Sequence, residues 1–477
     1  MIARRSLRPC VLALVLGFGP PVLAADLMQA WELARAGDPQ LAAAEAASLA
    51  TGEGVAISRA ALLPQVSASA SLTDNDGSSR RIGERPNQDG SVSFGPTSGF
   101  SDTRTRQYGL TLNQTLYDHA NYTRLRASRA RAERARADYE AALQGLVLRV
   151  AEAYFNVLTA IDSLAFARAE RRAVKRQLDQ AEQRFEVGLT AITDVHEARA
   201  RYDAARAAAI AAANQLDDAR ELLFEITGQY LEGLRGLGPD FRPVLPEPAD
   251  AGKWVDLALA NSPLLRARQL DLAAAEQDVA TVRSGHLPTL RAFVSRSNSD
   301  TWGSSGSNDF SFPADSGQLG TTVGLTLSVP IYSGGLVQSQ VRQALHQRDA
   351  AQEQYEQQRR AVTRSTRNAY RALQAGISEI AARAQALVSA KSALEATEAG
   401  FEVGTRTIVD VLLSQQQLFQ AQRNYSQARH TFLVNTLRLR QAAGVVGVED
   451  LQAVNALLVA DAEAALDDSE DEEAAGS

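Results

Sequence analysis

Alternating apolar and polar positions mark four segments of the chain as β-strands. Val66, Ala68, Ala70 and Leu72, for example, alternate with serine and threonine residues. This alternation predicts strands with one apolar face, as in a half-buried sheet or a membrane barrel. Between the strands of each pair we expect long loops rich in Gly, Ser and Asp. The four predicted strands cover residues 65–74, 104–117, 289–297 and 321–332, and the two loops cover residues 74–103 and 298–320.

Two longer segments carry apolar residues three or four positions apart, which is typical of helices packed as coiled coils. They run from about residue 122 to 187 and from about 336 to 403, without proline. At about 1.5 Å per residue, each helix is expected to be roughly 100 Å long. Gly188 and Gly404 follow these helices, as glycine follows many helix C-termini. The returning helices are expected over residues 192–227 and 408–443.

The order of these elements occurs twice. Each half reads helix, strand, loop, strand, long helix, turn, helix, and Gly188 and Asp194 recur as Gly404 and Asp410 at one constant spacing. A shared order of many landmarks predicts two structural repeats within a mainly α chain that also contains β-strands. We divide the chain into a first repeat (25–227), a connector (228–253), a second repeat (254–443) and a final segment (444–477).

The N-terminal residues 1–24 have the features of a secretory signal peptide. Arg4, Arg5 and Arg8 precede a short apolar run, and small residues stand before Ala25. No later segment reaches the roughly 20 apolar residues that a membrane helix needs. The chain's one cysteine, Cys10, lies in this leader, so the exported chain is expected to contain no disulfide and no cysteine-bound metal.

Composition excludes several classes of function. The 49 basic and 56 acidic residues give a net charge of −7, which disfavours binding to nucleic acid. The five histidines are scattered, and no phosphate-binding loop or nucleophile motif is present, so we expect neither an enzyme nor a cofactor. The run 467–473 is acidic at every position but Ser469 and predicts a disordered, solvated tail.

Four strands are too few to close a membrane barrel. Such barrels have at least about 8 strands, and open edges are excluded from lipid. Strands of about 10 residues are long enough to cross an outer membrane. We therefore expect several copies to share one barrel; three would supply twelve strands, and two copies also remain open on sequence alone. The long helices are too polar for lipid and are expected to project into the periplasm.

The chain resembles the TolC family of outer-membrane efflux and secretion channels. The resemblance covers nearly the whole exported chain. The stretches that carry it include Ala153–Leu158, Gln183–Leu189, Ala191–Val195, Gly285–Leu290 and Val403–Leu412.

The resemblance implies a homotrimer in the outer membrane of a Gram-negative bacterium. Twelve strands would form one β-barrel, in contact with outer-membrane lipid and continuous with a helical periplasmic tunnel. The connector and final segment would form an equatorial belt around the tunnel. The duct would serve multidrug efflux or type I secretion, with a periplasmic adaptor and an inner-membrane exporter of the RND or ABC type as partners.

The resemblance also implies a gate at the periplasmic entrance. Asp410 matches a position that faces the pore, where three carboxylates repel one another, raise the pKa of some members and attract cations, so weak cation binding is expected there. A capping role near a helix N-terminus is the plain alternative. The family's best-known member has a second aspartate where this chain has Leu413, so an apolar constriction is expected at that level.

Arg406 matches a family arginine that holds the entrance shut by bonding Asp194 and its neighbour Thr193. Phe401 stands where that member has tyrosine, so a hydroxyl link to Asp194 is missing and the closed state is expected to depend more on Arg406. The remaining matches are the hairpin turns that engage the adaptor: Val187, Gly188, Leu189, Val403, Gly404 and Thr405.

Two alternatives remain beside an export duct. An exported coiled-coil scaffold without a pore would explain the heptad pattern but not the four strand patterns. The second alternative is a channel for metal-ion efflux. The chain has only Met1 and Met28, so its methionine content does not show whether the channel carries metal ions.

Overall fold

The computed structural model describes residues 25–86, 88–238, 241–307 and 310–463. The predicted signal peptide and the acidic run 467–473 lie outside the described residues. The helices are α1 (Leu27–Gly37), α2 (Pro39–Ala60), α3 (His119–Glu186), α4 (Ile192–Thr227), α5 (Ala251–Asn261), α6 (Pro263–Arg283), α7 (Leu336–Glu402), α8 (Ile408–Ala442) and α9 (Val448–Asn455). The strands are β1 (Gln65–Pro86), β2 (Val92–Tyr117), β3 (Arg235–Leu237), β4 (Thr289–Ser307), β5 (Phe310–Pro313), β6 (Ser316–Ser328) and β7 (Leu458–Asp461).

The chain divides into two compact units. The sheet unit comprises Ala46–Asp138 and Leu264–Gln358 and holds the long strands together with parts of α2, α3, α6 and α7. The helical unit comprises the residues up to Glu45, Tyr139–Pro263 and the residues from Arg359 onward. It contains α1, α4, α5, α8, α9 and the remaining parts of α2, α3 and α7.

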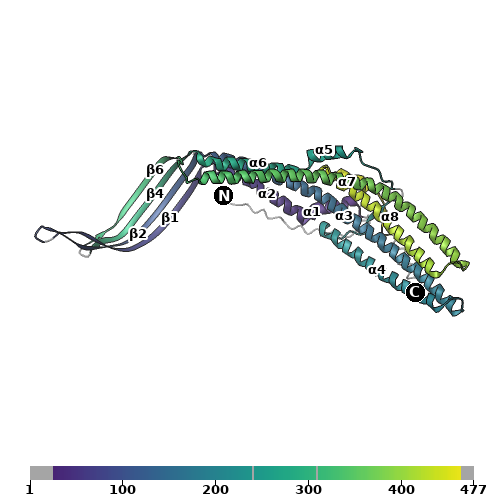
Figure 1. The fold of residues 1–477 in the computed structure, drawn as a ribbon. Coiled ribbons are helices and arrows are strands. Elements are labelled where there is room, and N and C mark those ends of the chain that lie inside the picture. The colour runs from purple at the N-terminus through teal and green to yellow at the C-terminus, as the bar shows by residue number, and fades with distance from the viewer. Residues whose placement is uncertain (1–24, 87, 239–240, 308–309, 464–477) are drawn as a thin grey trace, which may run out of the picture. The chain divides into compact units, whose positions relative to one another are not determined.

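The sheet unit contains one antiparallel sheet in which β1, β2, β4 and β6 lie side by side (Figure 1). β1 pairs with β2, β2 with β4, and β5 and β6 pair with successive parts of β4. In the described residues β1 has no partner on its other side, and neither has β6. The sheet therefore ends in two open edges.

The strand register places the apolar residues of all four long strands in one row. Val66 faces Leu112, Leu112 faces Val294 and Val294 faces Val323. Val66 and Val323 are 63% and 73% exposed, so no part of the described chain covers this apolar face. Ser67, Thr111, Ser295 and Thr322 form the next row, on the polar face.

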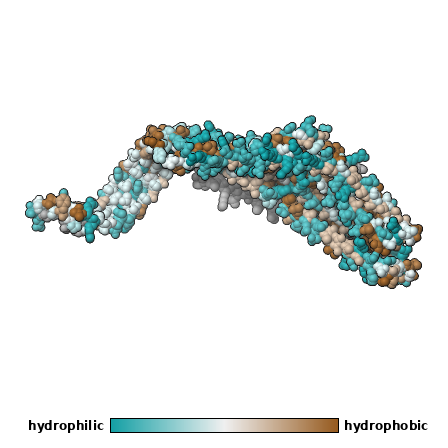
Figure 2. All heavy atoms as spheres, in the orientation of Figure 1, coloured by the Kyte–Doolittle hydropathy of each residue, from teal (hydrophilic) through white to brown (hydrophobic). Residues whose placement is uncertain are grey.

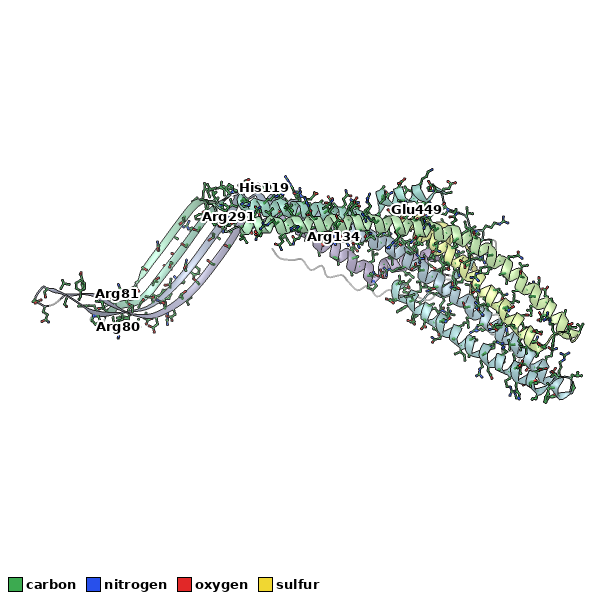
Figure 3. The ribbon with its side chains drawn as sticks, in the orientation of Figure 1. Arg80, Arg81, His119, Arg134, Arg291 and Glu449 are labelled. Carbon is green, nitrogen blue, oxygen red and sulfur yellow. The ribbon has the colours of Figure 1, made fainter. Side chains whose placement is uncertain are left out.

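The strands are longer than the alternation predicted. β1 and β2 continue through most of the predicted loop 74–103 and are paired from Gln65 with Asn113 to Pro86 with Val92. Arg80 and Arg81, which the prediction placed in the loop, belong to β1 (Figure 3). β4 extends to Ser307, β5 was not predicted, and β6 covers Ser316–Ser328 instead of residues 321–332. The outer parts are rich in Gly, Ser and Asp, and cross-strand pairing rather than apolar alternation holds them in the sheet.

Helices of the sheet unit are joined by ion pairs between α3 and α6. Arg134, labelled in Figure 3, lies 3.1 Å from a carboxylate oxygen of Asp271, and Arg131 pairs with Asp278. The hydroxyls of Thr123 and Thr281 lie 2.7 Å apart, at the other end of the same contact. Partly exposed pairs of this kind contribute about 0–1 kcal/mol each, so they fix the register of the two helices more than they stabilise the unit.

The core of the helical unit surrounds the middle of α3. Tyr154, Phe155, Leu158 and Ile161 are almost fully buried there, with residues of α1, α4 and α8 around them. The Tyr154 hydroxyl is hydrogen-bonded to the backbone oxygens of Arg235 (2.8 Å) and Ala25 (3.2 Å). α3 contains one stretch that is long and apolar enough to cross a membrane by composition, contrary to the sequence prediction, but more than half of that stretch is buried in the protein.

Capping residues define where α2 begins. The Asp38 carboxylate accepts a hydrogen bond from the Leu41 backbone N–H (2.8 Å) and forms an ion pair with Arg149 (2.6 Å). Burial of Asp38 raises its pKa, but Arg149 and the backbone N–H groups outweigh that effect and hold the pKa below its ordinary value. This pair joins the start of α2 to α3.

Candidate pore entrance and gate

The α3–α4 and α7–α8 hairpins turn through the same backbone motif. The Leu189 N–H donates to the Arg184 oxygen (2.8 Å), and the Gly188 N–H donates to the Phe185 oxygen (2.9 Å). The second hairpin repeats both bonds: Thr405 donates to Gly400 and Gly404 to Phe401. Gly188 and Gly404 have φ values of +74° and +79°, in the left-handed region that favours glycine. Sequence predicted both helix ends correctly, because each ends in this capping motif.

Apolar side chains project from both turns. Val187, Leu189 and Val403 are 70–75% exposed, and a side chain at Gly188 or Gly404 would meet no atom within 4 Å. Hydrophobic residues gather at the ends of these hairpins in Figure 2. Exposed apolar groups at a turn are a common feature of protein–protein contacts.

A small apolar core lies behind the turns. It contains Val174, Leu178 and Ala181 of α3, Val195 and Ala198 of α4, and Ile408 and Leu412 of α8. Phe401 and Tyr202 pack against it. The core joins the two hairpins and fixes the first turn of α8, which carries the predicted gate residues.

Asp410 is part of a capping box at the start of α8. Its carboxylate accepts hydrogen bonds from the Thr407 backbone N–H (3.0 Å) and hydroxyl (2.9 Å), while the Asp410 N–H donates to the Thr407 hydroxyl oxygen (3.3 Å). The Thr407 N–H, then its hydroxyl, and then the charge of Arg406 lower the pKa of Asp410 below its ordinary value. The capping alternative is therefore present in the single chain, with Asp410 in the first turn of α8.

The other predicted gate residues surround this turn. Leu413, one turn beyond Asp410, is 44% exposed. Asp194 lies in the first turn of α4, where the Thr190 hydroxyl donates to its carboxylate, and Thr193 beside it is exposed. Within one described chain, Arg406 forms no ion pair with Asp194.

The arrangement of Arg406 depends on Gly400. The Arg406 backbone N–H donates to the Gly400 oxygen (3.1 Å), and a Cβ at Gly400 would lie 2.8 Å from Cγ of Arg406. The arginine stem therefore lies across the last turn of α7, where any larger residue than glycine would displace it.

Sequence reasoning missed two residues of this site. The Arg184 guanidinium lies 4.8 Å from the centre of the Phe401 ring, a cation–π contact that joins α3 to α7. Thr407 was recognisable, because a threonine three residues before an acidic residue is a capping-box signal. Arg184 was not, because the contact depends on the register between two distant helices.

Comparisons with known proteins agree with this architecture. The sequence matches the family described as outer membrane efflux protein over residues 30–229 and again over 254–445. It is 38% identical to the outer membrane protein TolC of Escherichia coli, over 94% of this chain and 89% of the relative. It is 30% identical to the alkaline protease secretion protein AprF of Pseudomonas aeruginosa, over 91% of this chain and 88% of the relative.

Among solved structures, the Campylobacter jejuni CmeC outer membrane channel matches with a TM-score of 0.71 and 17% sequence identity, covering 93% of this chain and 95% of that chain. Fold and matches together define the class: a channel protein of the Gram-negative outer membrane, mainly α-helical with β-strands. The chain belongs to the outer membrane efflux protein family. Its function is that of an outer-membrane duct for export.

Proposed function

We propose that three copies of the chain form one channel, with the four long strands of each copy contributing to a twelve-stranded barrel. The observation that supports this most directly is the pair of open edges at β1 and β6 beside an uncovered apolar face. Unpaired backbone groups at a sheet edge are excluded from lipid, so each edge needs a partner. Pairing of β6 with β1 of the next copy satisfies both edges and leaves the apolar row facing lipid.

The two halves of the chain are, in this proposal, structural repeats, each supplying two strands and one helical hairpin. The turns at Gly188 and Gly404 have the same backbone conformation, and the family matches the chain over two separate ranges. Both observations support a division into two repeats. The connector 228–253 and the final segment from 444 would form the equatorial belt, and β3 and β7, one from each, pair with each other.

The duct works with partners: a periplasmic adaptor, and an inner-membrane exporter of the RND or ABC type. The substrates would be drugs, as the resemblance to multidrug efflux channels implies, or secreted proteins, as the name of the AprF relative implies. The exposed apolar residues Val187, Leu189 and Val403 would contact the adaptor, with Gly188, Gly404 and Thr405 shaping the turns. The channel acts without catalysis or a cofactor.

Asp410 and Leu413 line the periplasmic entrance in this proposal. Three Asp410 carboxylates would favour cations, and the Leu413 side chains one turn away would form an apolar constriction. Because Arg406 forms no ion pair with Asp194 inside one described chain, we propose that it engages Asp194 and Thr193 of a neighbouring copy. Exposed arginine–carboxylate pairs contribute about 0–1 kcal/mol, which suits a latch that opens.

Planar-bilayer recording of the purified protein tests the duct and its gate together. We expect small cation-selective openings that become larger in Arg406→Ala, and a loss of cation selectivity in Asp410→Asn. Arg176→Ala is the matched control for Arg406→Ala, because Arg176 is exposed on α3 and forms no ion pair in the described chain. A folded trimer that conducts no current in any variant would contradict the duct and favour a scaffold.

A further inference from the structure

One face of α7 in the helical unit carries a stripe of arginines. Arg360, Arg364, Arg367 and Arg371 follow one another at intervals of three or four residues, and all four are exposed. Residues three or four apart lie on one side of a helix, so the four guanidinium groups are neighbours. We call these four residues the arginine stripe.

The stripe faces away from the helix packing of α7. Val362, Thr366 and Leu373, which alternate with the arginines along the helix, are buried on another side. The Thr366 hydroxyl bonds to the Ala442 backbone oxygen at the end of α8 (3.3 Å), which identifies that side as the packed one. The arginines are therefore not needed to hold α7 against α8.

The stripe lines a groove together with Leu259 of α5. The groove has a volume of about 470 Å³, and its lining contains no carboxylate. Within the described residues, none of the four stripe arginines forms an ion pair. Like charges at this spacing repel and destabilise a helix, so an anionic partner in the groove would stabilise it.

After α8 the chain passes the end of α5, the helix whose Leu259 lines the groove. Gly444, after α8, packs against the backbone of Asn261 and Ser262 at the end of α5, so that a Cβ there would lie 2.6 Å from the Asn261 oxygen. α9 follows, with Glu449 in its first turn (Figure 3). Hydrogen bonds from Arg429 to Gly238 and from Gly238 to Leu457 place the start of β7 beside α8, about 20 Å along the helix from Ala442.

We propose that the acidic C-terminal segment of this chain, residues 464–477, binds in the groove on the arginine stripe. The segment has six carboxylates and no basic residue. It begins after Glu463, which forms an ion pair with Arg220 of α4 (2.7 Å). At about 3.4 Å per residue it extends up to about 48 Å. Arginine pairs with carboxylates through two parallel hydrogen bonds, so successive acidic residues match successive arginines of the stripe.

Disulfide formation between the segment and the groove tests the proposal directly. After removal of the leader the chain has no cysteine, so Ser469→Cys and Asn368→Cys introduce the only two thiols. Asn368 lines the groove and is exposed. In the purified full-length oligomer we expect rapid oxidation at low salt, within or between copies, and about tenfold slower oxidation in 1 M NaCl.

Charge variants show whether the oxidation rate depends on the arginine stripe itself or only on the net charge of α7. Arg364→Gln with Arg367→Gln should slow the disulfide about tenfold, whereas Arg364→Lys with Arg367→Lys should largely retain it. Arg342→Gln with Arg348→Gln removes the same charge from α7 outside the groove and should have no effect.

Two results would overturn the proposal. One is the absence of a disulfide although both thiols react with maleimide. The other is a disulfide whose rate depends on neither salt nor the stripe. Maleimide labelling of the Asn368→Cys thiol can also be compared in outer-membrane fragments that carry the full chain or a chain ending at residue 463. If labelling is equally slow in both, another anionic polymer of the envelope occupies the groove and the proposal is wrong.

Discussion

At the residue scale, the helical unit contains an ionisable side chain that the sequence pattern did not distinguish. His430 of α8 is 5% exposed; its Nδ1 lies 2.9 Å from the Thr159 hydroxyl, and its ring packs against Phe155. Burial first, and then the nearby charge of Arg429, lower the pKa of His430 to about 4. The histidine is therefore neutral in the folded chain at neutral pH.

This burial predicts an acid-dependent loss of stability. Between pH 6.5 and 4 the histidine is protonated in the unfolded chain but stays neutral in the folded chain. The free energy of unfolding therefore falls as the pH falls through this range. The loss at pH 4 is at most about 3 kcal/mol per chain. His430→Gln should flatten the pH dependence of the unfolding temperature, and His346→Gln, on an exposed position of α7, should leave it unchanged. A slope unaffected by His430→Gln would contradict the assignment.

At the element scale, the turns of the two hairpins are fixed by glycine conformation rather than by space. No atom lies within 4 Å of a Cβ at Gly188 or Gly404, but both residues have positive φ. A Cβ in this backbone region costs about 1–2 kcal/mol through contact with its own carbonyl oxygen.

The expected effects of alanine at these glycines therefore differ from its effect inside a helix. Gly188→Ala and Gly404→Ala should each lower the free energy of unfolding by about 1 kcal/mol and weaken adaptor binding. Gly52→Ala in α2 also meets open space, but without positive φ, and should raise stability by about 0.5–1 kcal/mol. Calorimetry of the three variants measures these changes in the free energy of unfolding. Equal changes for Gly188→Ala and Gly52→Ala would show that positive φ does not determine the cost of alanine at Gly188.

Helix ends were predictable from sequence, whereas strand ends were not. Pro39 and Pro263 begin α2 and α6 as the sequence indicates, since proline suits a first helical turn. The outer half of β1, from Asp74 onward, has the composition of a loop and pairs only because β2 lies opposite it. The sequence pattern of a segment shows only that segment's own preference for helix, strand or loop. Whether the segment joins a sheet also depends on a partner strand elsewhere in the chain.

The residues of the proposed gate could be named in part from the sequence, and the limit again lies in contacts between distant segments. Resemblance supplied Asp410, Arg406 and Leu413, and a local signal existed for Thr407. The Arg184–Phe401 contact and the absence of an Arg406–Asp194 pair inside one described chain depend on how α3, α4 and α7 pack. Sequence periodicity gives the apolar side of each helix but not its register against another.

At the scale of the whole molecule, the single chain is incomplete. Its sheet has an apolar face exposed along four strands and two unpaired edges in the described residues. The apolar face is costly in water, and the unpaired edges are costly in lipid. Copies joined edge to edge in a membrane pair both edges and leave the apolar face in contact with lipid. The contact between β1 and β6 of neighbouring copies therefore decides whether the chain forms a closed barrel.

Cysteine scanning across that contact is the most direct measurement. Ser69→Cys on β1 is combined in turn with Gly320→Cys, Thr322→Cys or Thr326→Cys on β6, and Ser67→Cys with Thr111→Cys serves as a control pair inside one chain. We expect at least one β1–β6 pair to oxidise to a covalently linked trimer and to nothing larger, while the control pair yields a monomer. Disulfides confined to single chains, or a ladder extending beyond three copies, would contradict it.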